Sequence, residues 1–248
     1  MIRSLKLLYL QTRADFVWYF LRDGEMIFWS LAFPVFFLFV FSFALGNGST
    51  RQTSTFLVPG LIGAQVFSSG FWGVGAMLST FRDKKVLRRI YLPPLPAWVF
   101  FGGLVLYRMT LLAGQAVLLA AVGMLVFKVR FVGNPLAILT ILAIGAATFV
   151  SLGSVIGALV RSTESANNVA SVLTVPLAFL SDAYFPIDRF PTAVANTLRM
   201  LPSTEFVDAF RGIAMNGYSL AHYSGWIGLL VLWALAGTAV TARYFRWV

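Results

Sequence analysis

Long apolar segments are the feature that most constrains the fold of this chain. A helix needs about 20 mostly apolar residues to cross a membrane. Six stretches approach or exceed that length, at residues 26–46, 56–80, 98–127, 135–160, 166–185 and 224–242. Only 11% of the 248 residues are charged, whereas roughly 25% are charged in a typical soluble domain. The sequence therefore predicts an all-α polytopic membrane protein with six transmembrane helices, in which residues 1–248 form a single transmembrane domain.

Two further segments are helical in pattern but too polar or too short to cross a membrane. Residues 1–23 place apolar side chains on one side of a helix and several cations off that side, which predicts an amphipathic helix lying at the membrane interface. Residues 186–220 offer Pro191 as a helix start and Pro202 as a stop. We expect two short re-entrant helices there, dipping into the outer face before the last span.

The basic residues predict the orientation of the chain. With the N-terminus inside, twelve Lys and Arg residues fall in inner segments and six in outer ones, and cytoplasmic loops carry the excess of such residues. Both termini are therefore expected in the cytoplasm, in a multi-pass protein of the cytoplasmic (inner) membrane. The net charge of +10 is explained by this bias, so no nucleic acid is expected as a partner besides the lipid bilayer.

Small residues recur every fourth position in two of the expected spans. Such residues let helix backbones approach closely in lipid. They predict packing either within one subunit or at the seam of a dimer, and they are Gly60, Ala64, Ser68, Gly153 and Gly157.

The apolar segments also contain candidates for a substrate path. The first span is rich in phenylalanine. We interpret Phe33 and Phe37 as lining a route for an apolar substrate. The alternative is that these rings pack in the bundle or face lipid. Asp182 lies near the end of the fifth span, and an ionisable group inside a membrane is expected to be functional or paired. It is either part of the path or bonded structurally to the outer helices.

Several kinds of chemistry find no support in the sequence. There is no cysteine and only one histidine, so no metal site is expected, and no nucleophile–base set is apparent. The dipeptide Gly-Lys does not occur, so the phosphate-binding GxxxxGK[ST] loop is missing. We therefore expect no enzyme activity and no cofactor in this chain, and any ATP and Mg would be bound by a partner subunit.

One strongly basic segment separates the second and third apolar stretches. Residues 81–96 read FRDKKVLRRIYLPPLP, in which the prolines stop a short helix before the third span. Such a helix carries apolar as well as charged side chains. It is interpreted as a cytoplasmic docking helix or, alternatively, as an anchor at anionic lipid.

These features together resemble the permease subunits of type 2 ABC exporters, the family of daunorubicin-type drug and lipid exporters and of polysaccharide exporters. Residues 56–100 resemble the family's "PG" span, charged segment and "TPLSPW"-like stretch. Residues 151–213 resemble its signature through Phe179-Leu180-Ser181, Phe185-Pro186, Phe190-Pro191, Leu201-Pro202 and Asp208-Ala209-Phe210-Arg211. Asp182 departs from the pattern, since the family usually has glycine there.

The resemblance implies a bacterial ATP-driven exporter of an amphipathic drug, lipid or glycan-lipid. It implies a second permease, identical or homologous, and two copies of a cytoplasmic ATP-binding subunit, with substrate crossing between the permeases. An ion-coupled secondary transporter or channel is the alternative. The same resemblance assigns residues 81–96 as the segment that couples to the ATPase, with contacts from Phe81, Arg82, Asp83, Lys84, Lys85, Val86, Leu87, Arg88, Arg89 and Ile90.

Overall fold

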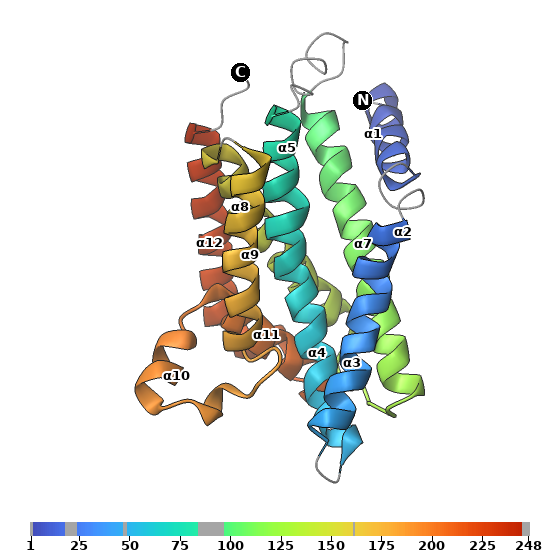
Figure 1. Ribbon diagram of the computed structural model, residues 1–248, viewed down its shortest axis with the longest axis vertical. Coiled ribbons are helices and arrows are strands. Elements are labelled where there is room, and N and C mark those ends of the chain that lie inside the picture. Colours follow the sequence, from blue (N-terminus) through green and yellow to red (C-terminus); the bar gives the residue numbers. More distant parts are fainter. Residues whose placement is uncertain (1, 18–23, 47–48, 84–96, 161, 245–248) are drawn as a thin grey trace.

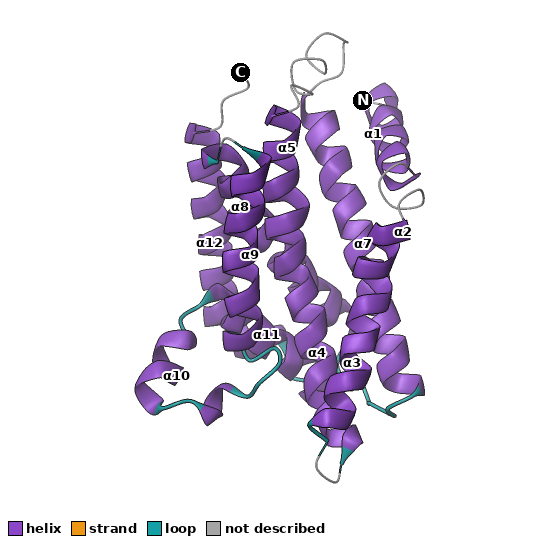
Figure 2. Cartoon of the chain, viewed as in Figure 1, coloured by secondary structure: helices purple, strands orange, loops and turns teal. Residues whose placement is uncertain are grey.

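The computed structural model of the chain describes residues 2–17, 24–46, 49–83, 97–160 and 162–244. All regular structure in these ranges is helical (Figure 2). The elements are α1 (Ile2–Asp15), α2 (Gly24–Ile27), η2 (Phe28–Ala32), α3 (Phe33–Ala44), α4 (Thr50–Ser68), η3 (Ser69–Ala76), α5 (Met77–Asp83), α7 (Ala97–Leu125), α8 (Pro135–Leu159), α9 (Thr163–Leu180), η4 (Ile187–Arg189), α10 (Thr192–Leu198), α11 (Pro202–Asn216), η5 (Leu220–Tyr223) and α12 (Ser224–Tyr244).

The helices follow the apolar segments of the sequence closely. Four stretches are long and apolar enough to cross a membrane, namely 50–81, 105–125, 135–159 and 220–244. The first apolar segment is a shorter helix, Phe28–Ala44. Helix α9 has 18 residues and carries Glu164 in its first turn. The all-helical membrane architecture is thus confirmed in its broad form, whereas the count of six spans remains a prediction.

The continuous helical segment α4–η3–α5 is the central element of the bundle (Figure 1). It contacts α3, α7, α8, α9 and α11. Eleven residues of α4 are buried, among them Leu57, Val58 and Phe67. Of the four stretches that can cross a membrane, this one is the most buried, which places it at the centre of the bundle.

Glycine allows α8 to pack closely on η3 and α5. A methyl group added to Gly153 would overlap the carbonyl oxygen of Gly70, and one added to Gly157 would lie 2.6 Å from Cβ of Leu78. Close approach of this kind permits dispersion contacts along the whole helix pair, which drive association in lipid. Gly153 and Gly157 therefore pack inside this chain.

The other small-residue run lies on α4. A methyl group added to Gly60 would overlap the carbonyl oxygen of Ala183, in the segment that follows α9. Ala64 is also buried, and Ser68 is partly buried. Gly60 thus packs against this chain as well, rather than presenting an open seam.

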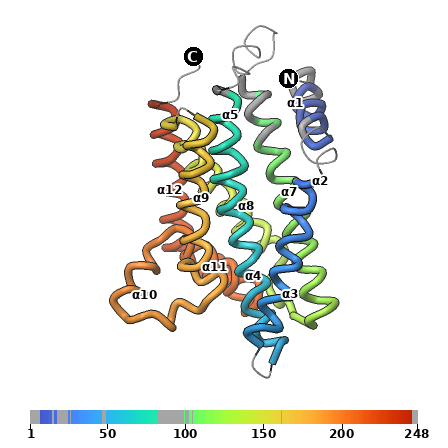
Figure 3. The backbone as a smooth tube through the Cα atoms, in the orientation of Figure 1, coloured from blue at the N-terminus to red at the C-terminus, as the bar shows by residue number. Residues whose placement is uncertain are grey.

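The N-terminal helix lies beside α7 (Figure 3). Thr12 Oγ1 donates a hydrogen bond to the carbonyl of Gly103 at 3.5 Å, and Gly102 and Gly103 leave room for Leu8 and Gln11. The packing of α1 on α7 is therefore built by glycine, while its placement at a membrane interface stays a prediction.

The two ends of the bundle carry different structures. Helix α1 and the end of α12 lie at one end, and the α3–α4 and α7–α8 connections lie at the other, together with α10 (Figure 1). Two short helices, α10 and α11, occupy the region 186–220 as the prolines indicate. Pro191 caps α10 and Pro202 begins α11. Their re-entrant placement in a membrane stays a prediction.

Candidate functional site

One face of α3 carries a ladder of aromatic rings. Phe33 and Phe37 lie with ring centroids 5.5 Å apart, and Phe37 and Phe41 stack at 4.3 Å. The ladder arises because side chains four residues apart share a helix face. Phe37 also lies 5.4 Å from the ring of Tyr184, which follows α9. The face therefore joins the first apolar segment to the segment after α9.

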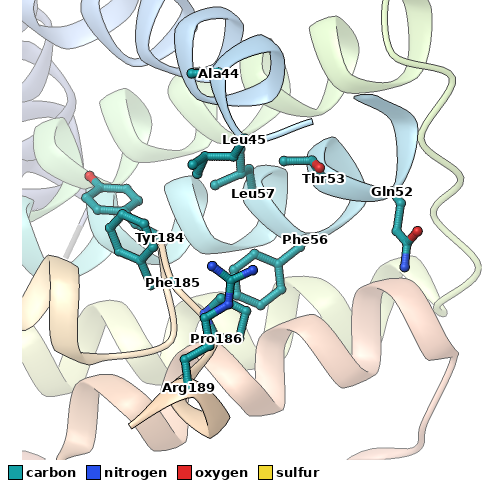
Figure 4. A pocket seen from close by; sticks show the side chains of 10 residues that line it. All are labelled: Ala44, Leu45, Gln52, Thr53, Phe56, Leu57, Tyr184, Phe185, Pro186 and Arg189. Atoms are coloured by element: carbon teal, nitrogen blue, oxygen red, sulfur yellow. The ribbon is translucent and has the colours of Figure 1, made fainter. Parts of the chain in front are cut away.

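A cavity of ≈ 400 Å³ lies where this ladder ends (Figure 4). Its walls come from the ends of α3 and α4 and from the segment after α9. It is mostly apolar, with polar groups from Gln52, Thr53 and Arg189, and its lining is Ala44, Leu45, Gln52, Thr53, Phe56, Leu57, Tyr184, Phe185, Pro186 and Arg189. A concave apolar site with a few polar groups is typical of a binding site for an amphipathic molecule.

Asp182 adopts a left-handed backbone conformation beside this cavity. Its φ is +62°, just after Ser181 ends α9. Helices commonly end in this conformation, and glycine is the residue that adopts it without strain. The glycine that the family resemblance leads us to expect at this position would adopt that conformation without strain. Asp182 replaces it, and its Oδ1 accepts a hydrogen bond from the N–H of Ile187 at 2.7 Å.

Asp182 forms an ion pair with Arg211 of α11. Both side chains are mostly buried, with exposures of 13% and 14%. The Arg211 guanidinium also donates to the backbone carbonyl oxygens of Asp182 and Phe56, at 2.5 and 3.4 Å, and lies 3.9 Å from the centroid of the Phe56 ring. This pair ties the end of α9 to α11 and α4, which is the structural bond that the sequence left open as an alternative.

Besides Asp182, a buried carboxyl group lies on helix α11, at a residue that the sequence analysis did not single out. Glu205 is 5% exposed, and its Oε2 is buried without a hydrogen-bond partner in the described part of the chain. Burial raises the pKa of Glu205 to about 7, because an ionised carboxylate loses its hydration in an apolar surrounding. This carboxyl group can therefore be protonated near neutral pH.

The expected coupling segment lies mostly outside the described residues, which end at Asp83 and resume at Ala97. Phe81 is described and is 7% exposed, in a cluster with Val74, Leu78, Tyr107 and Leu111. Its ring packs inside this chain, so the apolar face of a docking helix would have to come from later residues. Arg82 and Asp83 are the last residues of α5, and the coupling role of residues 82–90 stays a prediction.

The structure adds residues that the sequence alone did not assign to a site. Tyr184, Phe185 and Gln52 reach the cavity from segments far apart in the sequence. Arg211 was noted only as part of a family motif, although the buried pairing of a lone intramembrane carboxylate predicts some cation nearby. No local pattern indicates which cation that is, because the partner lies 29 residues away.

Comparison with known proteins gives consistent matches. The family described as "ABC-2 type transporter" matches residues 10–215. The chain is 26% identical over 194 residues to "Probable multidrug ABC transporter permease YbhR" of Escherichia coli (strain K12), which covers 77% of this chain and 52% of that protein.

Two other relatives match over shorter stretches. "Nodulation protein J" of Rhizobium meliloti (strain 1021) is 31% identical over 108 residues, covering 44% of this chain and 41% of that protein. "Linearmycin resistance permease protein LnrN" of Bacillus subtilis (strain 168) is 26% identical over 114 residues, covering 46% and 30%. The matches span about half, or less, of the length of these curated relatives.

Proposed function

Because this chain belongs to the ABC-2 type transporter family, we propose that it is the permease of an ATP-driven exporter that moves an amphipathic drug, lipid or glycan-lipid out of the cytoplasm. The relatives named as multidrug and linearmycin-resistance permeases support export of amphipathic molecules. Two copies of an ATP-binding subunit and a second permease, identical or homologous, complete the proposed assembly. The partner ATP-binding subunit would bind ATP and Mg.

The proposed topology has six spans and both termini in the cytoplasm. The first apolar helix, Phe28–Ala44, is shorter than the four stretches that can cross a membrane, and α9 has only 18 residues with Glu164 in its first turn. Their proposed role as spans is supported by their packing against α4 and η3. Cysteines placed at Ser49 and Ser162 of the cysteine-free chain test this. Labelling from outside intact cells should reach position 49 alone, and labelling at position 162 would contradict the topology.

The aromatic face of α3 is the observation that carries the proposed transport function. It continues through Tyr184 to a cavity at the end of the bundle opposite the described ends of the chain. Aromatic rings offer an apolar surface with little conformational entropy to lose. A substrate with an apolar part can therefore slide along the face, and the polar groups of the cavity would receive its polar part.

A matched pair of variants tests this route. Phe37→Ala removes a ring from the ladder, whereas Phe36→Ala removes a 61% exposed ring from another face of the same helix. We expect Phe37→Ala to lower substrate-stimulated ATP hydrolysis by the reconstituted complex several-fold and Phe36→Ala to leave it unchanged. Equal effects of the two variants would contradict the route.

The ion-coupled alternative gains one candidate from the structure. Asp182 is occupied by Arg211, so it lacks the free charge that ion coupling requires. Glu205, by contrast, is a buried carboxyl group that can change its protonation. Transport in vesicles separates the two functions: ATP with the partner subunit should drive uptake into inverted vesicles without a proton gradient. Uptake that follows the gradient alone and disappears in Glu205→Gln would favour the alternative.

A further inference from the structure

A second cavity, of ≈ 560 Å³, lies between α7 and α8, away from the aromatic face of α3. Its floor is α4, through Ile62, Gln65 and Val66, and Phe210 of α11 also reaches it. Both α7 and α8 pack on α4. We call this cavity the α7–α8 groove.

Alanine side chains create the groove. Ala113, Ala116 and Ala120 lie on one face of α7, and Ala143 and Ala146 lie opposite on α8. Larger side chains at these positions would fill the space between the two helices. Val117, Met124 and Leu139 line the groove and are exposed by 68%, 47% and 62%. The groove therefore opens sideways, toward the lipid that surrounds a membrane bundle.

The chemistry of the groove fits hydrocarbon. Gln65 is the polar side chain among the lining residues, and the other lining residues are apolar. Water gains few hydrogen bonds in such a cavity. An acyl chain, in contrast, gains dispersion contacts with both walls.

The connection between α7 and α8 closes one end of the groove and carries two cations. Phe131 and Gly133 of this connection line the groove. It is anchored by N–H groups of Val132 and Gly133, which donate to the Ala214 carbonyl at 3.0 and 3.2 Å. The connection is thus held in place by α11.

The two cations are exposed on this connection. Phe127 and Val129 are buried, and Lys128 and Arg130 between and after them are exposed. In the described part of the chain, neither cation forms an ion pair. Two unneutralised cations therefore lie next to an apolar groove that is open to lipid.

We propose that the α7–α8 groove binds an anionic phospholipid of the leaflet at that end of the bundle, with one acyl chain between the helices and the phosphate at Lys128 and Arg130. Basic groups beside grooves between transmembrane helices are suited to anionic headgroups. The two observations are complementary, because the groove provides a place for the chain and the cations select the headgroup.

Native mass spectrometry of the full-length permease tests the site. Purified protein is delipidated and titrated with phosphatidylglycerol or phosphatidylcholine of the same acyl chains. We expect wild type to retain phosphatidylglycerol preferentially. The double variant Lys128→Gln/Arg130→Gln should reduce that preference by about fivefold per cation, the factor expected for a basic residue near an anionic lipid. Arg51→Gln, which changes an exposed arginine in the first turn of α4, should leave it unchanged.

A second pair of variants tests the groove itself. Ala116→Leu fills it, whereas Ala236→Leu adds the same atoms to an exposed position on α12. Only Ala116→Leu should lose retention of both lipids, and its melting temperature should equal that of wild type. The proposal is overturned if wild type shows no preference for phosphatidylglycerol, if the double variant keeps the preference, or if Ala116→Leu retains lipid as wild type does.

Discussion

The ion pair between Asp182 and Arg211 should contribute unequally to stability when either partner is removed. Arg211→Met leaves the Asp182 carboxylate buried with one remaining hydrogen bond, from the N–H of Ile187. Asp182→Asn leaves Arg211 with two backbone carbonyls and the ring of Phe56. Asparagine also tolerates the left-handed conformation. The arginine is therefore better supported without its partner than the aspartate is.

The magnitudes follow from these remaining contacts. Removing one partner of a buried ion pair costs about 3–5 kcal/mol, which applies to Arg211→Met. For Asp182→Asn we expect about 1–3 kcal/mol, the cost of weakening hydrogen bonds to a charged group. A change of 1 kcal/mol shifts the melting temperature by about 2–4 °C in a protein of this size. The arginine variant should therefore melt about 6–20 °C below wild type.

These losses of stability can be measured by thermal unfolding. The experiment compares the purified permease with both single variants and the double variant. Because the two side chains touch, the double variant should cost less than the sum, by about 0.5–3 kcal/mol. Additive costs, or a larger loss in Asp182→Asn than in Arg211→Met, would refute the reasoning. The same variant tests the sequence-based prediction that Asp182 belongs to the substrate path. If Asp182→Asn assembles and changes the transport profile, Asp182 acts in the path besides pairing with Arg211. If the profile stays as in wild type, the role of Asp182 is the structural bond alone.

Three further predictions concern other parts of the chain. Gly153→Ala should cost about 1–3 kcal/mol by overpacking against η3, whereas Gly225→Ala, which meets open space, should not lower the melting temperature. Glu205 has a pKa raised from 4.5 to about 7, so the fold should lose stability as pH rises from about 4.5 through 7. Glu205→Gln should flatten that fall, and an unchanged profile would exclude Glu205 as its origin. Leu87→Asp should weaken co-purification with the ATPase more than Arg88→Ala does, since apolar anchors provide most of the affinity; the reverse order would indicate recognition by charge alone.

The helical segments could be predicted from the sequence because hydrophobicity is a local property. The expected span 98–127 is the helix Ala97–Leu125, and the expected span 135–160 is Pro135–Leu159. Proline and asparagine mark the start of the latter, where Asn134 accepts a hydrogen bond from the N–H of Leu136 at 2.9 Å. Such caps can be read from neighbouring residues alone.

The candidate site could be predicted only in part. Phe33 and Phe37 were identified because aromatic residues are dense in the first apolar segment, but density does not indicate which rings meet. The stacking of Phe37 on Phe41 and its contact with Tyr184 depend on how α3 lies beside the end of α9. In the same way, a buried carboxylate at position 182 predicts that a partner exists but does not indicate which residue it is.

The sequence by itself determined that this chain is a helical membrane protein with a charged connection between its second and third apolar segments. That follows because lipid requires every backbone polar group to be satisfied within a helix or a closed barrel. Only the tertiary structure decided that Asp182 pairs with Arg211, that Gly153 packs on Gly70, and that alanines leave a groove between α7 and α8. These outcomes depend on contacts between residues far apart in the chain. In lipid such contacts are selected by shape and by buried polar pairs, because apolar surface alone gives no preference for one helix partner over another.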